Sequence, residues 1–357
     1  MRPAYATTDR TFAVPLDRRG TGRSPPVTAR EAARFGDPAR LAAHLGHFRA
    51  DAVVDDAELI RRHLCGDTPR DTLGQSHGGF LALTYLSRVP RGLRACHVAG
   101  GPPGLAATAD DVHARTCPRV RDRCHAYCAR HPGDAVLLRR LADLLDAHDV
   151  RLPGGDRLAV RRLRTLGPAL GAGDGFERLH WLLDEALGAD GAPSGAFLHR
   201  VAALTGPVDA PLFAVLQESL YGQGAGPTGR AAHRALAGRP EFAEAAGPLL
   251  LTGEMTHPWM SREIAGLRPF AEAAELLATR ADRPPLYDLE RPAAEEVPLA
   301  AVVCHDGMRV DAGLSLDAAR RIGAARVRAT DEREHDGLTA SRGRVLARLV
   351  ERTAGRV

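Results

Sequence analysis

Gly74-Gln75-Ser76-His77-Gly78 stands between a short apolar step and a run of residues that has the character of a buried helix. A Gly-x-Ser-x-Gly pattern is typical of a tight turn from a strand into a helix, because glycines two residues either side of the serine remove Cβ atoms that would clash. Such a turn strains the serine backbone and exposes its Oγ at the positive end of the following helix. Ordinary turns also contain this pattern, so the interpretation of Ser76 as a nucleophile depends on its surroundings.

The segments around the turn favour a parallel sheet covered by helices. Residues 11–16 have the character of a strand, and apolar residues recur at helical spacing over residues 38–64. A short strand at residues 72–73 leads into the turn, and residues 94–101 are the next strand candidate. This alternation of strands and helices predicts an α/β fold with a mostly parallel sheet flanked by helices.

The middle of the chain has a different character. Residues 105–290 are helix-like, rich in Leu, Ala and Arg, and broken by clusters of Gly and Pro, without alternating strands. Strand signals return in the continuous apolar run 297–304, which suits a buried parallel strand, and again at 325–330. We therefore predict a sheet domain formed by residues 1–104 and 291–357, with residues 105–290 inserted as a helical cap.

Composition excludes several classes of protein. The 357 residues include 48 basic and 44 acidic side chains that are interleaved, and no basic stripe with aromatic residues indicates a nucleic-acid partner. No apolar run approaches the 18 residues or so that a membrane span requires. The first residues lack the apolar core of a secretion signal, so we expect a cytoplasmic protein with six reduced cysteines. The sequence does not indicate the oligomeric state.

One group of residues suggests a metal site at first sight. Cys117, Cys124 and Cys128 lie near His125 and His131 in the sequence. Their spacing matches no standard zinc pattern, and two of the cysteines are four residues apart on a predicted helix. We expect free structural thiols here and no metal.

A serine nucleophile needs a histidine base and an acid that orients this histidine. The loop after strand 297–304 offers Asp306 and Asp311, and the loop after the last strand offers His335. The chain order nucleophile, acid, histidine, each after a strand, is that of the α/β-hydrolase fold. We expect His335 to take the proton of Ser76 and pass it to the leaving amine.

The sequence as a whole resembles the proline iminopeptidases, which are serine peptidases of the α/β-hydrolase fold. The resemblance implies an enzyme that removes an N-terminal proline from peptides without a metal or an organic cofactor. It also implies that two glutamates of the cap, here Glu218 and Glu254, hold the free amine of the substrate, since a buried cation needs a carboxylate partner. The resemblance extends nearly end to end and is carried by residues 16–24, 74–85, 253–260, 306–310 and 334–338.

The chain departs from this family at its start. Family members begin with more sheet, including a His-Gly-Gly-Pro-Gly turn that donates one backbone N–H to the oxyanion hole. This chain begins past that point, so we expect the first strands to be missing, through either a start codon that lies upstream or a degenerate copy. The remaining oxyanion donor would be the backbone N–H of His77.

A second departure concerns the acid. Relatives usually show Asp-Asp-Met where this chain has Asp306-Gly307-Met308, and the spacing to His335 points to the second Asp as their catalytic acid. We expect Asp306 to take its place after a small shift of the loop, with Asp311 as a distant substitute.

Three functions follow from these observations. The first is an aminopeptidase that releases N-terminal proline through an acyl-enzyme on Ser76. The second is a truncated, catalytically impaired α/β-hydrolase-fold protein that binds peptides without turning them over. The third is a hydrolase that acts on another ester or amide.

Overall fold

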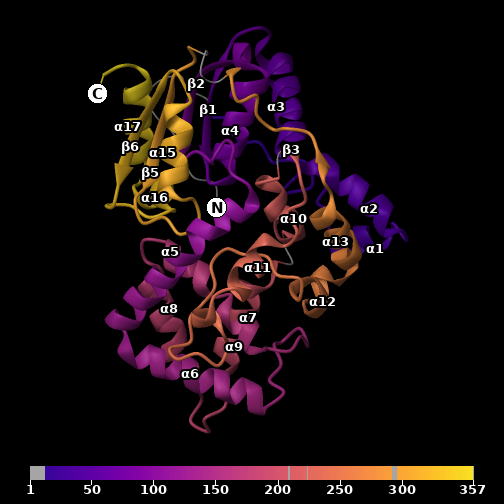
Figure 1. Cartoon of the computed structure of the whole chain (residues 1–357), viewed down its shortest axis with the longest axis vertical. Helices are drawn as coiled ribbons and strands as arrows, with labels where there is room; N and C mark the ends of the chain where they lie inside the picture. Colours follow the sequence, from indigo (N-terminus) through magenta and orange to yellow (C-terminus); the bar gives the residue numbers. More distant parts are fainter. Residues whose placement is uncertain (1–12, 208–209, 223, 292–295, 357) are drawn as a thin grey trace.

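A four-stranded sheet is the centre of the computed structural model, which describes residues 13–207, 210–222, 224–291 and 296–356 (Figure 1). All three strand pairings are parallel, as the alternation of strands and helices predicts. Strand β5 shows why: its six residues are all apolar and all buried, so both faces of the strand need cover from helices. The strands are β1 (Arg70–Gln75), β2 (Leu93–Ala99), β5 (Leu299–Cys304) and β6 (Ala325–Thr330), in the order β1-β2-β5-β6.

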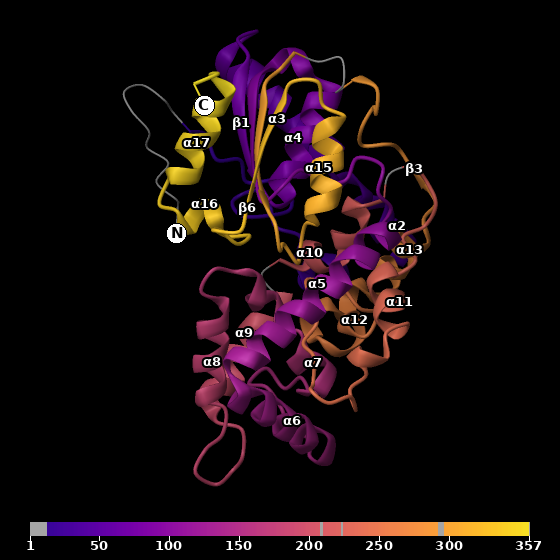
Figure 2. The same ribbon diagram turned by 60° about the vertical axis from the view of Figure 1, so that its left-hand side comes forward.

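Helices cover the two faces of this sheet unequally (Figure 2). On one face, α3 (Ala50–Cys65), α4 (His77–Arg88) and α15 (Ala312–Arg320) contribute side chains to one apolar cluster with β2 and β5. The other face is covered by α16 (Gly337–Ala340) and the amphipathic helix α17 (Arg344–Thr353), whose buried residues pack on β2 and β5. The serine turn therefore lies at the carboxyl end of β1, the strand at one edge of this sheet, on which α4 packs.

The chain between β2 and β5 is helical, as predicted, apart from one short antiparallel pair in its described part, β3 (Gly224–Ala225) with β4 (Asp282–Arg283). Its largest apolar cluster is separate from that of the sheet and includes Tyr127, Leu141 and Phe197. None of the helices in the described segments combines the length and apolar character needed to cross a membrane. The helices are α5 (Ala109–Arg130), α6 (Pro132–Ala147), α7 (Val160–Arg164), α8 (Gly175–Asp184), α9 (Gly195–Thr205), α10 (Pro211–Leu216), α11 (Ala231–Ala237), α12 (Met260–Glu263) and α13 (Ala271–Thr279).

The structure differs from the sequence-based division near the start of the chain. The expected strand at residues 11–16 is absent from its described part, residues 13–16, where Pro15 has no N–H to offer a sheet. The predicted helix over residues 38–64 is two helices, α2 (Pro38–Leu45) and α3, because the backbone of Arg49 is extended between them. Helix α2 and the preceding α1 (Ala29–Ala33) share an apolar cluster with α10 and α13, so they pack on helices of the predicted cap and not on the sheet.

Candidate active site

Ser76 has the backbone geometry of a strained turn between a strand and a helix. Strand β1 ends one residue before it and α4 begins one residue after it, and its φ of 56° and ψ of −119° are rare for a residue with a side chain. A Cβ on Gly74 would lie 2.1 Å from the carbonyl oxygen of Gly78, whereas a Cβ on Gly78 itself would meet nothing within 4 Å. The second critical glycine is instead Gly79, where a Cβ would come within 3.1 Å of Val98 on β2.

The expected oxyanion donor, His77, is the first residue of α4. The first backbone N–H groups of a helix have no acceptor within the helix, so that of His77 is available for a ligand. The ring of His77 contacts the Arg18 guanidinium, and because an arginine only donates, Nδ1 of His77 accepts this hydrogen bond. Burial, aided by the charge of Arg18, lowers the pKa of His77 to about 3, so this ring is neutral.

His335 lies beside the serine turn. Its backbone N–H donates to the carbonyl of Gly171 at 3.2 Å, and its own carbonyl accepts from Nε2 of Gln75 at 2.6 Å. Its ring packs on Gly100, where a Cβ would lie 3.1 Å from both Cε1 and Nδ1 of the ring. Since Gln75 directly precedes Ser76, the structure brings the predicted base and the predicted nucleophile to the same edge of the sheet.

Burial controls the charge of His335. The side chain is buried, and its Nε2 has no hydrogen-bond partner among the described residues. Burial, with a smaller effect of the Arg309 charge, lowers the pKa of His335 to about 4, while Asp336 acts in the opposite direction. The ring is therefore neutral at physiological pH and able to accept a proton.

Asp306 does not contact His335 in this structure. Its exposed carboxylate is 2.8 Å from Nδ1 of His305 and 3.8 Å from Arg119. It is nevertheless close to the loop of the predicted base, since its charge contributes to a raised pKa of Glu334, after burial as the main cause. No hydrogen bond joins any carboxylate of the described residues to the ring of His335.

The remaining acid of this loop is engaged elsewhere. Asp311 caps the N-terminus of α15 by accepting from the backbone N–H of Leu314 at 3.0 Å, and it lies 3.7 Å from Arg115. The loop is also closed around Gly307, where a Cβ would lie 2.8 Å from the carbonyl oxygen of Val310. A side chain at position 307 thus requires a different loop conformation.

The two predicted amine-binding glutamates lie in one electrostatic environment. Oε1 of the buried Glu218 accepts from the backbone N–H of Ala232 at 3.0 Å, and its Oε2 is buried without a partner among the described residues. Glu254 pairs with Arg309 at 3.3 Å. Burial raises the pKa of both carboxyls, and the charges of both contribute, after burial, to the raised pKa of Tyr221. Both glutamates therefore lie close to this tyrosine.

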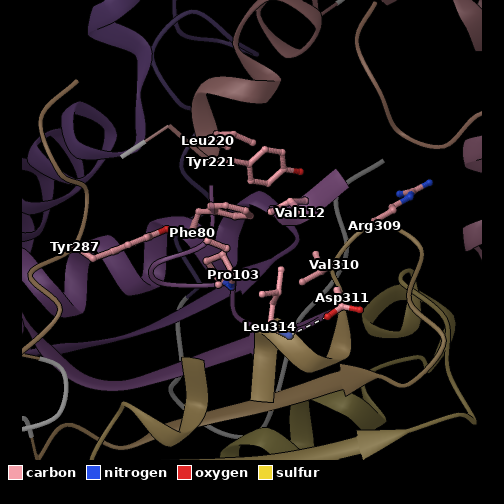
Figure 3. Close-up of a pocket in the computed structure, with 12 residues that line it drawn as sticks. Phe80, Pro103, Val112, Leu220, Tyr221, Tyr287, Arg309, Val310, Asp311 and Leu314 are labelled. Carbon is pink, nitrogen blue, oxygen red and sulfur yellow. Dashed lines mark hydrogen bonds between the residues drawn. The ribbon is translucent and has the colours of Figure 1, made fainter. Parts of the chain in front are cut away.

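A mostly apolar pocket opens next to these groups (Figure 3). Phe80, one turn into the helix that begins after Ser76, faces Tyr221 with 5.8 Å between ring centroids. In Figure 3 the side chain of Arg309 lies to one side of the pocket, apart from these two rings. The lining residues are Phe80, Pro103, Gly104, Ala107, Val112, Leu220, Tyr221, Tyr287, Arg309, Val310, Asp311 and Leu314.

Four residues of this region were not predicted from the sequence: Arg18, Tyr221, Arg309 and Asp336. Arg18 and Arg309 lie in segments that carry the family resemblance. Nothing in their local sequence indicates that Arg18 contacts His77 or that Arg309 contacts Glu254. Asp336 directly follows His335, and its carboxylate accepts from the backbone N–H of Gly173 at 3.0 Å.

Comparison with known proteins decides the family. Residues 8–189 match the family described as alpha/beta hydrolase fold. A proline iminopeptidase from Aeromonas sobria is 42% identical over 337 residues, which are 94% of this chain and 78% of the relative. This chain belongs to the proline iminopeptidase family. Membership confirms the α/β-hydrolase fold predicted from the order of Ser76, Asp306 and His335.

A second member of the proline iminopeptidase family gives the same result at greater distance. The proline iminopeptidase aneH of Aspergillus aculeatus is 30% identical over 327 residues, which cover 86% of this chain and 70% of the relative. Among solved structures, an alpha/beta fold family hydrolase from Bacillus anthracis covers 94% of this chain, which covers 80% of it, at 13% identity and a TM-score of 0.39. The structural likeness carries no weight in the assignment.

Because His335 is buried, we expect kcat/KM to have an unusual dependence on pH. A general base must be neutral, and the pKa of His335 is lowered to about 4 from 6.5, so we expect the acidic limb of kcat/KM near pH 4 and not near 6.5. An ester substrate without an amine should be used, because it separates this limb from ionisation of Glu218 and Glu254.

The same shift makes the folded state less stable in acid. A histidine with a lowered folded pKa binds its proton more readily when unfolded, so stability falls as the pH drops from about 6.5 towards 4. Far-ultraviolet circular dichroism over this range is therefore the control. A limb near pH 6.5 in protein that remains folded would contradict a buried, neutral base.

Proposed function

We propose that this chain is a serine aminopeptidase that releases N-terminal proline from peptides. The observation that carries the proposal is the 42% identity to the proline iminopeptidase of Aeromonas sobria over 94% of this chain. The strained backbone at Ser76 supports it, because an enzyme of this class needs its serine exposed at the tip of such a turn. The six cysteines are all free thiols, which supports a cytoplasmic location.

The proposed reaction proceeds through an acyl-enzyme. Oγ of Ser76 attacks the carbonyl carbon of the N-terminal proline while His335 takes the hydroxyl proton. The backbone N–H of His77 donates to the oxyanion, and His335 then gives its proton to the leaving amine as the C–N bond breaks. Water then attacks the acyl carbon while His335 takes its proton. The bond from this carbon to Oγ of Ser76 breaks, His335 returns the proton to Oγ, and proline leaves.

Recognition of the substrate rests on charge and shape. The secondary ammonium of an N-terminal proline needs a carboxylate partner when it leaves water, and Glu218 and Glu254 are held next to the apolar pocket in this role. The buried and unpaired Oε2 of Glu218 supports this assignment. The rings of Phe80 and Tyr221 provide an apolar surface that suits the pyrrolidine ring.

We assign the acid to Asp306. Of the two carboxylates on its loop, only Asp306 is free to change partners, because its present contacts are with exposed side chains, whereas Asp311 is buried as a helix cap. In the proposed mechanism the Asp306 carboxylate leaves His305 and, with a shift of its loop, fixes the tautomer of His335.

One observation favours a second function, that of a catalytically impaired peptide-binding protein. No carboxylate of the described residues accepts a hydrogen bond from the ring of His335, and without an orienting acid a triad loses about 10⁴-fold in rate. Measurement of turnover decides between the two functions.

The decisive experiment is release of a fluorophore from a proline amide by the full chain and by Ser76→Ala. We expect turnover by the unchanged chain and only the background rate for the variant, because the nucleophile is lost. Labelling with a fluorophosphonate, which reacts with activated serines, is measured in parallel. Labelling of Ser76 without proline release would indicate another ester or amide substrate, and neither signal from folded protein would support the impaired function.

Recognition of the amine is tested by Glu254→Gln, with the exposed Glu272→Gln on α13 as the matched control. Loss of a charge-assisted bond of about 1.5–3 kcal/mol predicts a roughly 10- to 100-fold rise in KM for a free proline amide. An ester that lacks the amine should show an unchanged KM. Equal effects on both substrates would exclude a role in binding the ammonium.

The assignment of the acid is tested by Asp306→Asn. We expect kcat to fall by about 10²–10⁴-fold with little change in KM, because the asparagine cannot stabilise the imidazolium of His335. His305→Ala, which removes the present partner of Asp306, is the control and should retain activity. An unchanged kcat for Asp306→Asn would show that another group, or none, orients His335.

A further inference from the structure

Three potential metal ligands meet in the helical region, on elements other than those that carry Ser76, His335 and the two glutamates. His131 joins α5 to α6, Asp134 lies in the first turn of α6, and His180 projects from α8. One ligand atom from each residue can be chosen so that all three lie within 4.8 Å of one another. These helices form the lower part of the molecule in Figure 1.

The arrangement of these three groups is already close to that of a coordination sphere. Oδ2 of Asp134 lies 2.9 Å from Nδ1 of His180. Ligands at about 2.0–2.1 Å from a tetrahedral ion are about 3.3 Å apart, so the widest pair needs to approach by at most about 1.5 Å. The rings of His131 and His180 are stacked, with 4.4 Å between centroids and 16° between planes, which places the two imidazoles next to each other.

His131 carries an unexplained polar atom. Its Nε2 is buried and has no hydrogen-bond partner among the described residues. Buried polar groups in native proteins nearly always have a partner, and an unsatisfied one often marks an ion or water that belongs at the site. His180 is one-third exposed, at 35% for its side chain, which leaves a path for an ion from solvent.

The surroundings hold the carboxylate in place. The hydroxyl of Tyr127 donates to Oδ2 of Asp134. Phe176 packs edge-on against Tyr127, with 5.4 Å between centroids. An outer partner of this kind is typical of metal-binding carboxylates.

The nearby cysteines are not the ligands. Burial raises the pKa of Cys117 to about 11 and that of Cys124 to about 12, which disfavours the thiolate that binds a metal. The sequence places His131 near these cysteines, whereas the fold brings it to Asp134 and to the distant His180.

We propose that His131, Asp134 and His180 bind one divalent transition-metal ion of the zinc class, with water as the fourth ligand. Two imidazoles and a carboxylate form a donor set that suits zinc, cobalt or nickel ions better than magnesium or calcium ions. The ion would fasten α8 to the α5–α6 junction and so stabilise the helical region.

The position of the site connects it to the loop of His335. Arg123, two turns before His131 on α5, pairs with Glu334 at 2.9 Å. The segment that leads into α8 bonds the same loop through Gly171 and Gly173. Both elements that the ion would join therefore contact the residues on either side of the predicted base.

Metal binding is measured by calorimetric titration of the chelator-treated full chain with zinc and by the visible spectrum of the cobalt-loaded chain. We expect one saturable site per chain with a tetrahedral cobalt spectrum and a raised Tm on addition of zinc. His180→Ala and His131→Ala should each weaken binding by at least about 10- to 100-fold, because each removes a ligand. His125→Ala, at an exposed position of the same helix α5, is the matched control and should bind as the unchanged chain does.

Three results would overturn the proposal. The first is the absence of saturable binding by the unchanged chain. The second is an affinity of His180→Ala and His131→Ala equal to that of the unchanged chain. The third is loss of binding in His125→Ala as well. Circular dichroism of each variant shows that loss of binding does not reflect loss of the fold. The readouts do not depend on peptidase activity, so they stand whether or not proline release is observed.

Discussion

The reversed backbone at Ser76 is the constraint on which the site depends. A residue with a side chain held at positive φ costs about 1–3 kcal/mol, and it persists only where its surroundings over-determine it. Here the backbone N–H of Ser76 donates to the carbonyl of Ala99, the β1–β2 ladder runs up to the turn, and the missing Cβ of Gly74 leaves room for the carbonyl of Gly78. Gly100, on which the ring of His335 packs, directly follows β2 of the same ladder, so one constraint positions both the proposed nucleophile and the proposed base.

Burial shifts the pKa of four titratable side chains of the candidate site. It lowers the pKa of His77 and of His335, and it raises the pKa of Glu218 and of Glu254. All four shifts favour neutral forms, as expected where water is excluded. A cationic substrate reverses the balance for the glutamates, because an ammonium beside a buried carboxylate stabilises its ionised form. The two glutamates therefore favour a bound cation. Arg309, which pairs with Glu254, is a cation that the chain itself supplies.

The fold was predictable because its signals are local. The Gly-x-Ser-x-Gly turn and the apolar run of β5 each follow from residues close in sequence. With the order of serine and histidine along the chain, they suffice for the α/β-hydrolase fold. What sequence could not supply are contacts between distant segments. The packing of α1 and α2 on α10 and α13, the Arg18–His77 contact and the Arg309–Glu254 pair all join residues that no periodicity relates. The role of Gly79 on α4 was missed for the same reason, since Val98, which a Cβ on Gly79 would meet, belongs to β2.

The loop that carries Asp306 keeps this carboxylate away from the ring of His335. It is closed around Gly307, where a Cβ would lie 2.8 Å from a backbone oxygen, and Asp306 contacts His305. In the proposed reaction His335 becomes an imidazolium. Burial and the charge of Arg309 oppose that form, and the charge of Asp336 favours it. A carboxylate that reaches the ring therefore stabilises the reacting state more than it would beside an exposed histidine, because it offsets two unfavourable effects at once. In the proposed mechanism this carboxylate is that of Asp306, so its position relative to His335 controls the rate of acyl transfer.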